Sequence, residues 1–360
     1  MIVKIFLVFS TILLSSALPG RKGELLSLIQ VYRHGERSPI VFFPTDPYQD
    51  ASYWNTGFGQ LTNTGKLQHY KLGQYTRSRY RNFIPKYYSN EFFRVQTTNK
   101  DRTFMSAASN LAGLFPPVGY QVWKQGLQWQ PIPVFPVTEA VLSDYSNCDA
   151  YNTAISQLST TDEYFVSLSE ENQELMAYLS EHTGSNITSL SDIVMIWDSL
   201  QIEYLRGYTL PEWTQSVFPE PLTSLVSSLY LASSYTEELK IFTTGPFINA
   251  LIEHFEGILA NSTDPPYLQY SGHDINLACI LNTLGAYPSA VPGFASTIYF
   301  ELRQTRRMNY INIYYIKVSG AEPEPITLSG CGFNCDLRDF KSILSNRTIT
   351  PDEWTELCSA

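Results

Sequence analysis

The segment Arg33-His34-Gly35-Glu36-Arg37-Ser38-Pro39 places one imidazole between two guanidinium groups. A phosphoryl group in transfer spreads negative charge over its equatorial oxygens, and fixed positive donors stabilise that charge. Arginine offers a planar pair of N–H donors that matches phosphate oxygens, and a neutral imidazole has a nucleophilic lone pair. Gly35 leaves room for the backbone to turn and to approach an anion closely. The pattern is too specific for an ordinary surface loop and predicts phosphoryl transfer with His34 as the nucleophile.

His273, Asp274 and Arg102 are weaker candidates for the same chemistry. A His-Asp dipeptide taken alone is more often structural, but this one stands between a predicted strand and a predicted helix. An arginine beside an aspartate is usually a surface ion pair, yet Arg102 lies near a predicted helix start, which suits anions. Their positions in the predicted elements therefore add them to the candidate site.

Three apolar, β-rich runs predict the strands that position these side chains. Leu25–Tyr32 is typical of a buried central strand and leads directly into Arg33-His34. Phe92–Val95 and Tyr267–Ser271 are the other two runs, and His273 follows the second of them. Because the carboxyl ends of parallel strands share one edge of a sheet, where ligands bind, we expect these distant segments to meet in one cleft.

Further elements alternate between strands and helices. Helices are predicted from Arg102 to about Leu114 and over Ile275–Leu284. We expect a strand at Leu239–Thr243, followed through Gly245-Pro246 by an amphipathic helix. Two more strands, Thr297–Arg303 and Tyr310–Val318, predict an antiparallel hairpin. The alternation predicts an α/β fold with a central, mostly parallel sheet flanked by helices.

The stretch 141–235 lacks this alternation and is polar and mainly helical in pattern. We therefore expect a helical cap at 141–235, inserted into an α/β catalytic core formed by 18–140 and 236–360.

The composition excludes some functions. The chain has 360 residues, of which 44% are hydrophobic and 16% charged, as in globular proteins. Its formal net charge of −10 disfavours nucleic acid or an anionic membrane as a partner. An anionic substrate then needs a local cluster of arginines.

The N-terminal residues 1–17 have the pattern of a signal peptide. Lys4 precedes the apolar run Ile5–Leu14, and small residues follow at Ser15-Ser16-Ala17. A transmembrane anchor is the alternative, but this run is too short to span a bilayer comfortably. Glycosylation sequons begin at Asn186, Asn261 and Asn346. These features predict a secreted or lysosomal glycoprotein without a membrane anchor.

Five cysteines are present, so at least one stays unpaired within the chain. Cys331 and Cys335 are close in a Gly-rich turn, where a local disulfide competes with a zinc site. A zinc site is disfavoured because only Cys358 and no histidine follows them. Cys279 lies in an apolar run, and we expect a free, buried thiol there.

The sequence resembles the histidine acid phosphatases, a branch of the histidine phosphatase superfamily, and within them the prostatic and lysosomal type. The resemblance spans nearly the whole chain after residue 17. Besides the His34 motif it is carried by Phe43-Pro44-Thr45-Asp46-Pro47, Gly57-Phe58-Gly59-Gln60-Leu61-Thr62, Asp101-Arg102-Thr103, Asn110–Pro117 and Trp129-Gln130-Pro131-Ile132-Pro133.

The resemblance implies a phosphoglycerate mutase-like fold and a phosphohistidine intermediate on His34. It also implies a phosphate clamp formed by Arg33, Arg37 and Arg102. His273 is similar to a second histidine that donates to the phosphate. No metal or cofactor is implied.

Asp274 matches the general acid that protonates the leaving alcohol. The resemblance further implies disulfides Cys148–Cys358 and Cys331–Cys335, which again leaves Cys279 unpaired. Nearby arginines should lower the pKa of His34, so that it stays neutral in acid, whereas Asp274 must carry a proton. We therefore expect acid phosphatase activity on phosphate monoesters with an acidic pH optimum.

Substrates, partners and alternatives stay open at several points. Phosphoproteins and phospholipids are substrate classes besides small phosphomonoesters, and a homodimer is implied only by the resemblance. Gln96-Thr97-Thr98-Asn99 departs from the Arg-Ser-Thr-Asp common in relatives, which changes the pocket rather than the clamp. The alternatives are a phytase-like or other specialised phosphatase and a secreted, non-catalytic anion-binding protein. His69, His182 and His254 are expected to be exposed or at the edge of the core.

Overall fold

The computed structural model describes residues 23–138, 141–142 and 145–359, and the predicted signal peptide at 1–17 lies outside them. Within these residues eight strands form one sheet. The strands are β1 (Glu24–Arg33), β2 (Phe93–Thr97), β3 (Val134–Pro136), β4 (Tyr267–Gly272), β5 (Thr297–Gln304), β6 (Asn309–Ile316), β7 (Glu324–Ile326) and β8 (Cys335–Asp336).

The sheet has a parallel half and an antiparallel half. The strand order is β3-β2-β4-β1-β5-β6-β7, and β8 pairs with β6. Strands β3, β2, β4 and β1 are parallel neighbours, whereas β5 to β8 pair in antiparallel fashion. The predicted hairpin is the pair β5–β6. The parallel half is the half whose strands lead into the candidate site residues.

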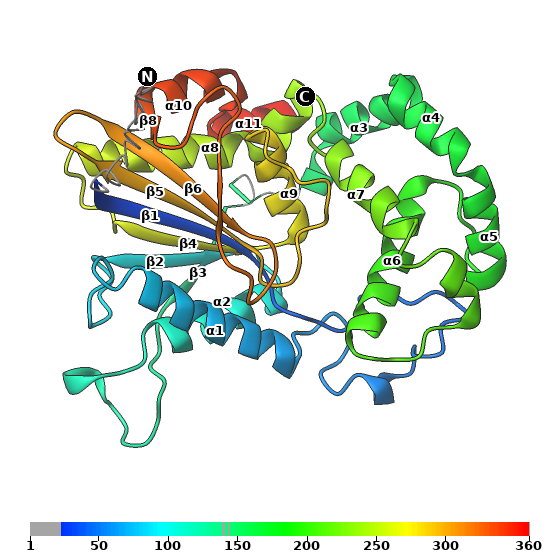
Figure 1. The fold of residues 1–360 in the computed structure, drawn as a ribbon, viewed down its shortest axis with the longest axis horizontal. Helices are drawn as coiled ribbons and strands as arrows, with labels where there is room; N and C mark the ends of the chain where they lie inside the picture. Colours follow the sequence, from blue (N-terminus) through cyan, green and yellow to red (C-terminus); the bar gives the residue numbers. More distant parts are fainter. Residues whose placement is uncertain (1–22, 139–140, 143–144, 360) are drawn as a thin grey trace, which may run out of the picture.

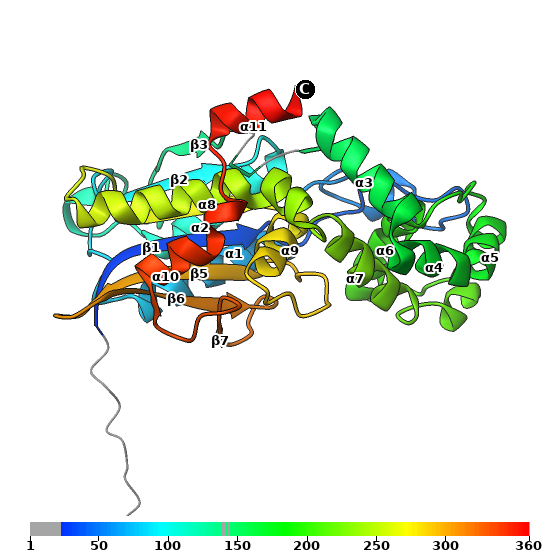
Figure 2. The same ribbon diagram turned by 90° about the horizontal axis from the view of Figure 1, so that it is seen from above.

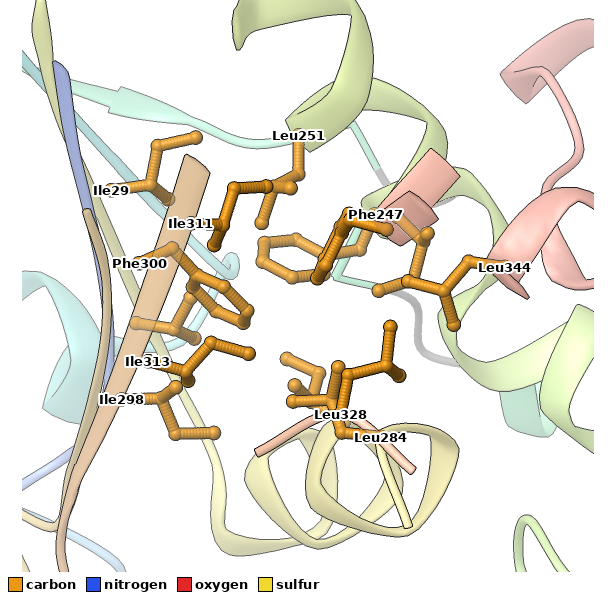
Figure 3. Close-up of a cluster of buried hydrophobic side chains, with 14 of the residues drawn as sticks. Ile29, Phe247, Leu251, Leu284, Ile298, Phe300, Ile311, Ile313, Leu328 and Leu344 are labelled. Atoms are coloured by element: carbon orange, nitrogen blue, oxygen red, sulfur yellow. The ribbon is translucent and has the colours of Figure 1, made fainter. Parts of the chain in front are cut away.

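Strand β1 lies between β4 and β5 and is buried on both faces, as its apolar sequence predicts. Its side chains alternate between two cores, because successive residues of a strand point to opposite faces. Ile29 and Val31 join the larger core, shown in part in Figure 3, where Phe247 and Leu251 of a covering helix meet Ile29 and Phe300 of the sheet.

Helices cover both faces of the sheet (Figure 1). On one face lie α1 (Asn63–Arg79) and α2 (Asp101–Leu114), which bury Leu28 and Tyr32 of β1. On the other lie α8 (Glu237–Leu259), α9 (Asp274–Thr283) and α10 (Leu337–Leu344). The C-terminal helix α11 (Pro351–Cys358) packs against α8.

The strand predicted at Leu239–Thr243 is wrong, because α8 begins before it and continues through Pro246. Proline has no backbone N–H, so Pro246 leaves the carbonyl of Phe242, four residues earlier, without its helical donor. The indole Nε1 of Trp354, in α11, donates to this carbonyl at 2.8 Å. A contact distant in sequence therefore compensates for the residue that made the pattern resemble a strand, a turn and a shorter helix.

The remaining helices lie beyond the carboxyl ends of the parallel strands, to the right in Figures 1 and 2. They are α3 (Asp149–Thr161), α4 (Glu163–Glu171), α5 (Gln173–Thr183), α6 (Leu190–Leu205) and α7 (Leu222–Ala232). Phe43, from the loop after β1, packs in the core of α5 to α7. We propose that 141–235 forms the cap inserted between 18–140 and 236–360, with this loop attached to it.

Two disulfides are present, Cys148–Cys358 and Cys331–Cys335, which are the pairings that the resemblance implies. The first links the start of α3 to the last residue of α11. Cys279 is a free, buried thiol, as predicted. Disulfides of this kind fit an oxidising compartment such as the extracellular space or the lysosome. Among the described residues, no helix is both long and apolar enough to cross a membrane.

Candidate active site

Three adjacent parallel strands end at the same edge of the sheet and lead into the candidate residues. Arg33 of β1 pairs with Gly272 of β4, and Ser271 of β4 pairs with Thr97 of β2. The backbone N–H of His34 donates to the Gly272 carbonyl at 2.9 Å, which extends this pairing beyond the strand. The ends of β1, β4 and β2 thus bring together segments that are far apart in the sequence.

His34 is buried, with 1% of its surface exposed, and its hydrogen bonds fix its tautomer. Its Nδ1 lies 2.8 Å from the carbonyl oxygen of Gly35, and a carbonyl can only accept. Nδ1 therefore carries the proton, and Nε2 of the neutral ring has the free lone pair. Burial lowers the pKa of His34 well below its ordinary value, and Arg33 and Arg37 lower it further.

Gly35 has a packing role that differs from the one expected. A Cβ atom at this position would overlap the backbone of Gly65 in the first turn of α1. The backbone N–H of Gly35 donates to Ser106 Oγ of α2 at 3.1 Å. The two glycines let the loop after β1 lie directly against α1, which holds the backbone of His34 in place.

Each predicted clamp arginine makes specific contacts. Nη2 of Arg33 lies 2.5 Å from Oδ2 of Asp274, and its guanidinium stacks over the Phe294 ring. Arg37 forms two hydrogen bonds with the carboxylate of Asp198, at 2.8 and 3.0 Å. Arg102, the second residue of α2, contacts Nδ1 of His273 through Nη2 at 3.5 Å.

The three arginines share one further feature. The Nε–H group of each is buried and has no hydrogen-bond partner among the described residues. Buried donors without partners are rare because leaving them unpaired costs free energy. All three guanidinium groups lie near enough to lower the pKa of His34. The cluster is therefore suited to an anion and repels a metal cation.

A chain of hydroxyls orients His273. The Thr103 hydroxyl directs its single proton toward the backbone carbonyls of Thr98 and Lys100, so its oxygen can only accept from the Thr98 hydroxyl, 3.1 Å away. The Thr98 hydroxyl in turn accepts from Nε2 of His273 at 2.9 Å. Nδ1 of His273 is left on the side of Arg102. Burial, followed by the charge of Arg102, lowers the pKa of His273 to about 3.

Asp274 is the first residue of α9, directly after the His273 N-cap. Its Oδ1 accepts from the backbone N–H of Ile275 at 2.8 Å. Burial by itself would raise the pKa of Asp274, but the charges of Arg33 and Arg37 outweigh it and hold that pKa below its ordinary value. The Asp274 carboxyl group is therefore ionised as long as no bound anion offsets the charges of Arg33 and Arg37.

Asp198 and Tyr230 belong to this cluster, although the sequence did not point to them. Asp198 holds Arg37 from α6. Tyr230, on α7, is half-buried near Asp274, and burial followed by the charge of Asp274 raises the pKa of its phenol. A signal for Asp198 exists in retrospect, because it is an acidic residue within the apolar run Ile193–Leu200 of α6.

The expectation for His69 is wrong. This residue is fully buried on α1, and its Nε2 donates to the carbonyl of Arg33 at 3.0 Å. Burial lowers the pKa of His69 to about 3, so the ring is neutral. His69 therefore positions the backbone just before His34. His254 lies at the edge of the core, as expected, and bonds to Ser27.

The chain matches the profile described as "Histidine phosphatase superfamily (branch 2)" over residues 24–319. Prostatic acid phosphatase of Bos taurus is 35% identical over 366 aligned positions, which cover 97% of this chain and 93% of that protein. Lysosomal acid phosphatase of Homo sapiens is 34% identical over 348 positions, which cover 94% of this chain and 81% of that protein.

Solved structures of similar fold are more distant in sequence. Hafnia alvei phytase in complex with myo-inositol hexakis sulphate has a TM-score of 0.65 at 15% identity, covering 91% of this chain and 97% of that chain. Multiple inositol polyphosphate phosphatase of Bifidobacterium longum in complex with inositol hexasulfate has a TM-score of 0.60 at 12% identity, covering 94% and 96%. These two structures support the fold alone. The profile match and the identity to its sequence relatives show that the chain belongs to branch 2 of the histidine phosphatase superfamily.

Proposed function

We propose that this protein is an acid phosphatase that hydrolyses phosphate monoesters through a phosphohistidine on His34. The observation that carries the proposal is the set of buried, unpartnered Nε–H groups of Arg33, Arg37 and Arg102 around an imidazole whose Nε2 is free. A phosphoryl group supplies the acceptors that these donors lack and the electrophile that Nε2 attacks.

In the first step, the Nε2 lone pair of His34 forms a bond to phosphorus while the ester P–O bond breaks. Asp274 gives its proton to the departing alkoxide, so that a neutral alcohol leaves. The three arginines stabilise the charge on the equatorial oxygens. His273 lies beside Arg102. A bound phosphate offsets the charge of Arg102 that helps to lower the pKa of His273, so that the ring can take up a second proton and donate from Nδ1 to the same oxygens.

In the second step, water attacks the phosphorus of phosphohistidine and the P–N bond breaks. The Asp274 carboxylate accepts the proton that the water loses, and His34 recovers its lone pair. Inorganic phosphate is released, and the proton taken from the water has restored the acid form of Asp274. One water is consumed in each cycle, and no oxidant or reductant is needed.

The pH dependence follows from Asp274. In the free protein Arg33 and Arg37 hold its pKa low. A bound phosphate group neutralises both arginines, so the pKa of Asp274 rises in the complex and the carboxyl can hold the proton that the first step needs. This requirement is met only at acidic pH, whereas the lowered pKa of His34 keeps the nucleophile neutral there.

Secretion or delivery to the lysosome forms part of the proposal. The two disulfides support it, and the sequon residues Asn186, Asn261 and Asn346 are all exposed, so that glycans could be attached at each of them. Two relatives carry the names prostatic and lysosomal acid phosphatase. A homodimer stays a prediction, which light scattering on the purified protein tests.

A non-catalytic anion-binding protein is the second candidate from a different class. It would need the arginines but not the free Nε2 of His34 or Asp274. Hydrolysis of an aryl phosphate across pH by wild type, His34→Ala and Asp274→Asn separates the two. The proposal predicts an acidic optimum that His34→Ala abolishes and Asp274→Asn sharply reduces. Phosphate binding without hydrolysis of aryl, nucleotide or inositol phosphates would overturn it.

A further inference from the structure

The loop between α9 and β5 contacts two residues of the candidate site. The carbonyl of Pro292, which lies 259 residues from Arg33 in the sequence, accepts from Nη1 of Arg33 at 2.6 Å. The carbonyl of Ser296 accepts from the backbone N–H of Arg33 at 3.0 Å. The backbone N–H of Ala295 donates to the carbonyl of His34 at 3.1 Å. The loop therefore holds the end of β1 by both its backbone and a side chain.

Phe294 of the same loop lies against the face of the Arg33 guanidinium. The central carbon of this group is 4.2 Å from the centroid of the ring, which is the geometry of a cation–π contact. The ring centroids of Phe294 and His34 are 6.0 Å apart. Only 6% of the surface of Phe294 is exposed, so the ring keeps water from this face of the guanidinium. Phe294 thus lies beside both the proposed nucleophile and a proposed phosphate-binding group.

Three contacts fix the plane of the Arg33 guanidinium. Its face rests on Phe294, its Nη1 donates to the Pro292 carbonyl, and its Nη2 pairs with Asp274. An arginine side chain has several rotatable bonds, so without such contacts its donors would take many orientations. The ring and the Pro292 carbonyl do not depend on Asp274. They can therefore hold the guanidinium while Arg33 exchanges that carboxylate for a phosphate group.

The loop is held in a conformation that its own residues do not favour. Ala295 is buried and has a φ of +57°, in the left-handed region that costs free energy for a residue with a Cβ atom. The Phe294 carbonyl accepts from the N–H of Ser319 at 3.1 Å, and the N–H of Gly293 donates to the Lys317 carbonyl at 3.0 Å. These contacts to the chain after β6 impose the conformation, as is typical where the position of a residue serves a functional site.

We propose, on the basis of the proposed function, that Phe294 is a positioning residue for Arg33. Its ring keeps the guanidinium aligned, so that Arg33 can exchange Asp274 for the phosphate group of the substrate without losing its orientation. Phe294 acts through Arg33 and not on the substrate. The requirement is for a flat aromatic ring under a flat guanidinium, and apolar bulk alone does not meet it.

The first test compares two substitutions of Phe294 with a matched control. Phe294→Leu keeps an apolar side chain but removes the ring, whereas Phe294→Tyr keeps the ring. Phe340→Leu makes the same change at a buried position on α10, within the larger core of the sheet. The kcat and KM for phenyl phosphate, the affinity for inorganic phosphate by isothermal titration calorimetry, and thermal unfolding are measured for each full-length protein.

Phe294→Leu is expected to lower kcat/KM by about tenfold, because a small displacement of a group that serves the transition state has a large effect on rate. It should weaken the binding of inorganic phosphate by about threefold or more, since the contact that aligns Arg33 is lost. Phe294→Tyr should stay within about threefold of wild type in both quantities. Phe340→Leu should lower the unfolding temperature, as the loss of core packing predicts, but keep kcat/KM within about twofold of wild type.

The second test asks whether Phe294 acts through Arg33. Arg33→Lys keeps the positive charge but has no planar group to lie flat on the ring. In this background Phe294→Leu should weaken phosphate binding by less than about twofold, because the effects of two residues in contact are not additive. A general structural role of Phe294 would instead give the same loss of phosphate affinity in both backgrounds.

The outcomes separate this inference from the function on which it rests. If the wild type hydrolyses no monoester, the proposed function fails, and the affinities for inorganic phosphate alone decide the inference. If Phe294→Leu retains as much kcat/KM and phosphate affinity as Phe340→Leu, the function stands and the inference is overturned. It is also overturned if Phe294→Tyr loses as much as Phe294→Leu, or if Phe294→Leu causes equal losses with Arg33 and with Arg33→Lys.

Discussion

Nη2 of Arg33 lies 2.5 Å from Oδ2 of Asp274, in an ion pair of which both side chains are largely buried. Arg33, which is proposed to bind the phosphate, and Asp274, the proposed general acid, are therefore paired with each other before substrate binds. Substrate must take over Arg33, and this exchange releases Asp274 from the charge that keeps it ionised. Substrate binding and the loading of the general acid are thus coupled through one contact.

The first prediction concerns Asp274→Asn. Asparagine cannot give a proton, so kcat for phenyl phosphate should fall by roughly a hundredfold or more. The loss should be several times smaller for 4-nitrophenyl phosphate, whose better leaving group needs less protonation. In wild type the alkaline limb of the kcat profile should lie at a higher pH than the ordinary pKa of an aspartate, and the variant should lack it. Equal losses for both substrates would contradict the role of Asp274 as general acid.

A second prediction concerns Asp198, which orients Arg37 through two hydrogen bonds. Asp198→Asn keeps the size of the side chain but leaves a buried guanidinium without its counter-charge. We expect kcat/KM to fall by about tenfold or more and the free energy of unfolding by about 1–3 kcal/mol. Glu163→Gln, which removes an exposed carboxylate from α4, is the control and should change neither quantity measurably. Retention of full activity by Asp198→Asn would show that Arg37 needs no such partner.

The third prediction tests the hydroxyl chain that ends at His273. Thr98→Val preserves the shape of the side chain but removes the acceptor for Nε2–H. The ring of His273 can then rotate or change tautomer, so kcat should fall by about tenfold. Thr98→Ser keeps the hydroxyl and should recover most of the activity. If Val and Ser at this position have the same kcat, the hydroxyl does not position His273.

Stability should also depend on pH, because the carboxyl groups of Glu203 and Asp46 lie close enough to repel each other when both are ionised, so that one of them must carry a proton. Glu203 is fully buried, and neither of its Oε atoms has a donor group as partner among the described residues. Burial and the nearby charge of Asp46 raise the pKa of Glu203 from its ordinary 4.5 to about 9. Between these values the folded protein binds more protons than the unfolded chain, so stability falls as pH rises.

Glu203→Gln removes this titration. Thermal unfolding of wild type between pH 4 and 8 should show a decline in stability of up to about 1.4 kcal/mol per pH unit from this pair, and the variant should show a flatter curve. Glu212→Gln, at an exposed position nearby in the chain, should retain the wild-type slope. A wild-type slope in Glu203→Gln would mean that Glu203 does not hold a proton above its ordinary pKa.

The parts of the fold that the sequence predicted are those with local signals. β1, β4 and α9 have continuous apolar runs, and the motif residues stand directly at their ends, so the parallel-sheet rule was enough to bring His34 and His273 together. The strand predicted at Leu239–Thr243 is wrong because the helix continues through Pro246. The Phe242 carbonyl, which Pro246 leaves without its helical donor, accepts instead from Trp354, 112 residues away.

The residues that were missed depend on contacts across the chain. Asp198 lies 161 residues from Arg37 in the sequence. Thr98 acquires its role only through its contacts with Thr103 and His273. His69 was expected to be exposed or at the edge of the core, but the Arg33 carbonyl gives its Nε2–H a buried partner. No pattern of spacing encodes these pairs.

The most direct test of the central claim is to trap the covalent intermediate. Wild type and His34→Ala are mixed with phenyl phosphate, quenched in alkali within the turnover time, digested, and analysed by mass spectrometry, because phosphohistidine survives alkali better than acid. We predict one added phosphoryl group on the His34-containing peptide of wild type, lost on acid treatment and absent from the variant. A catalytically active protein with no phosphoryl group on that peptide, when the reaction is run at low temperature to slow hydrolysis of the intermediate and is then quenched in alkali, would contradict the mechanism.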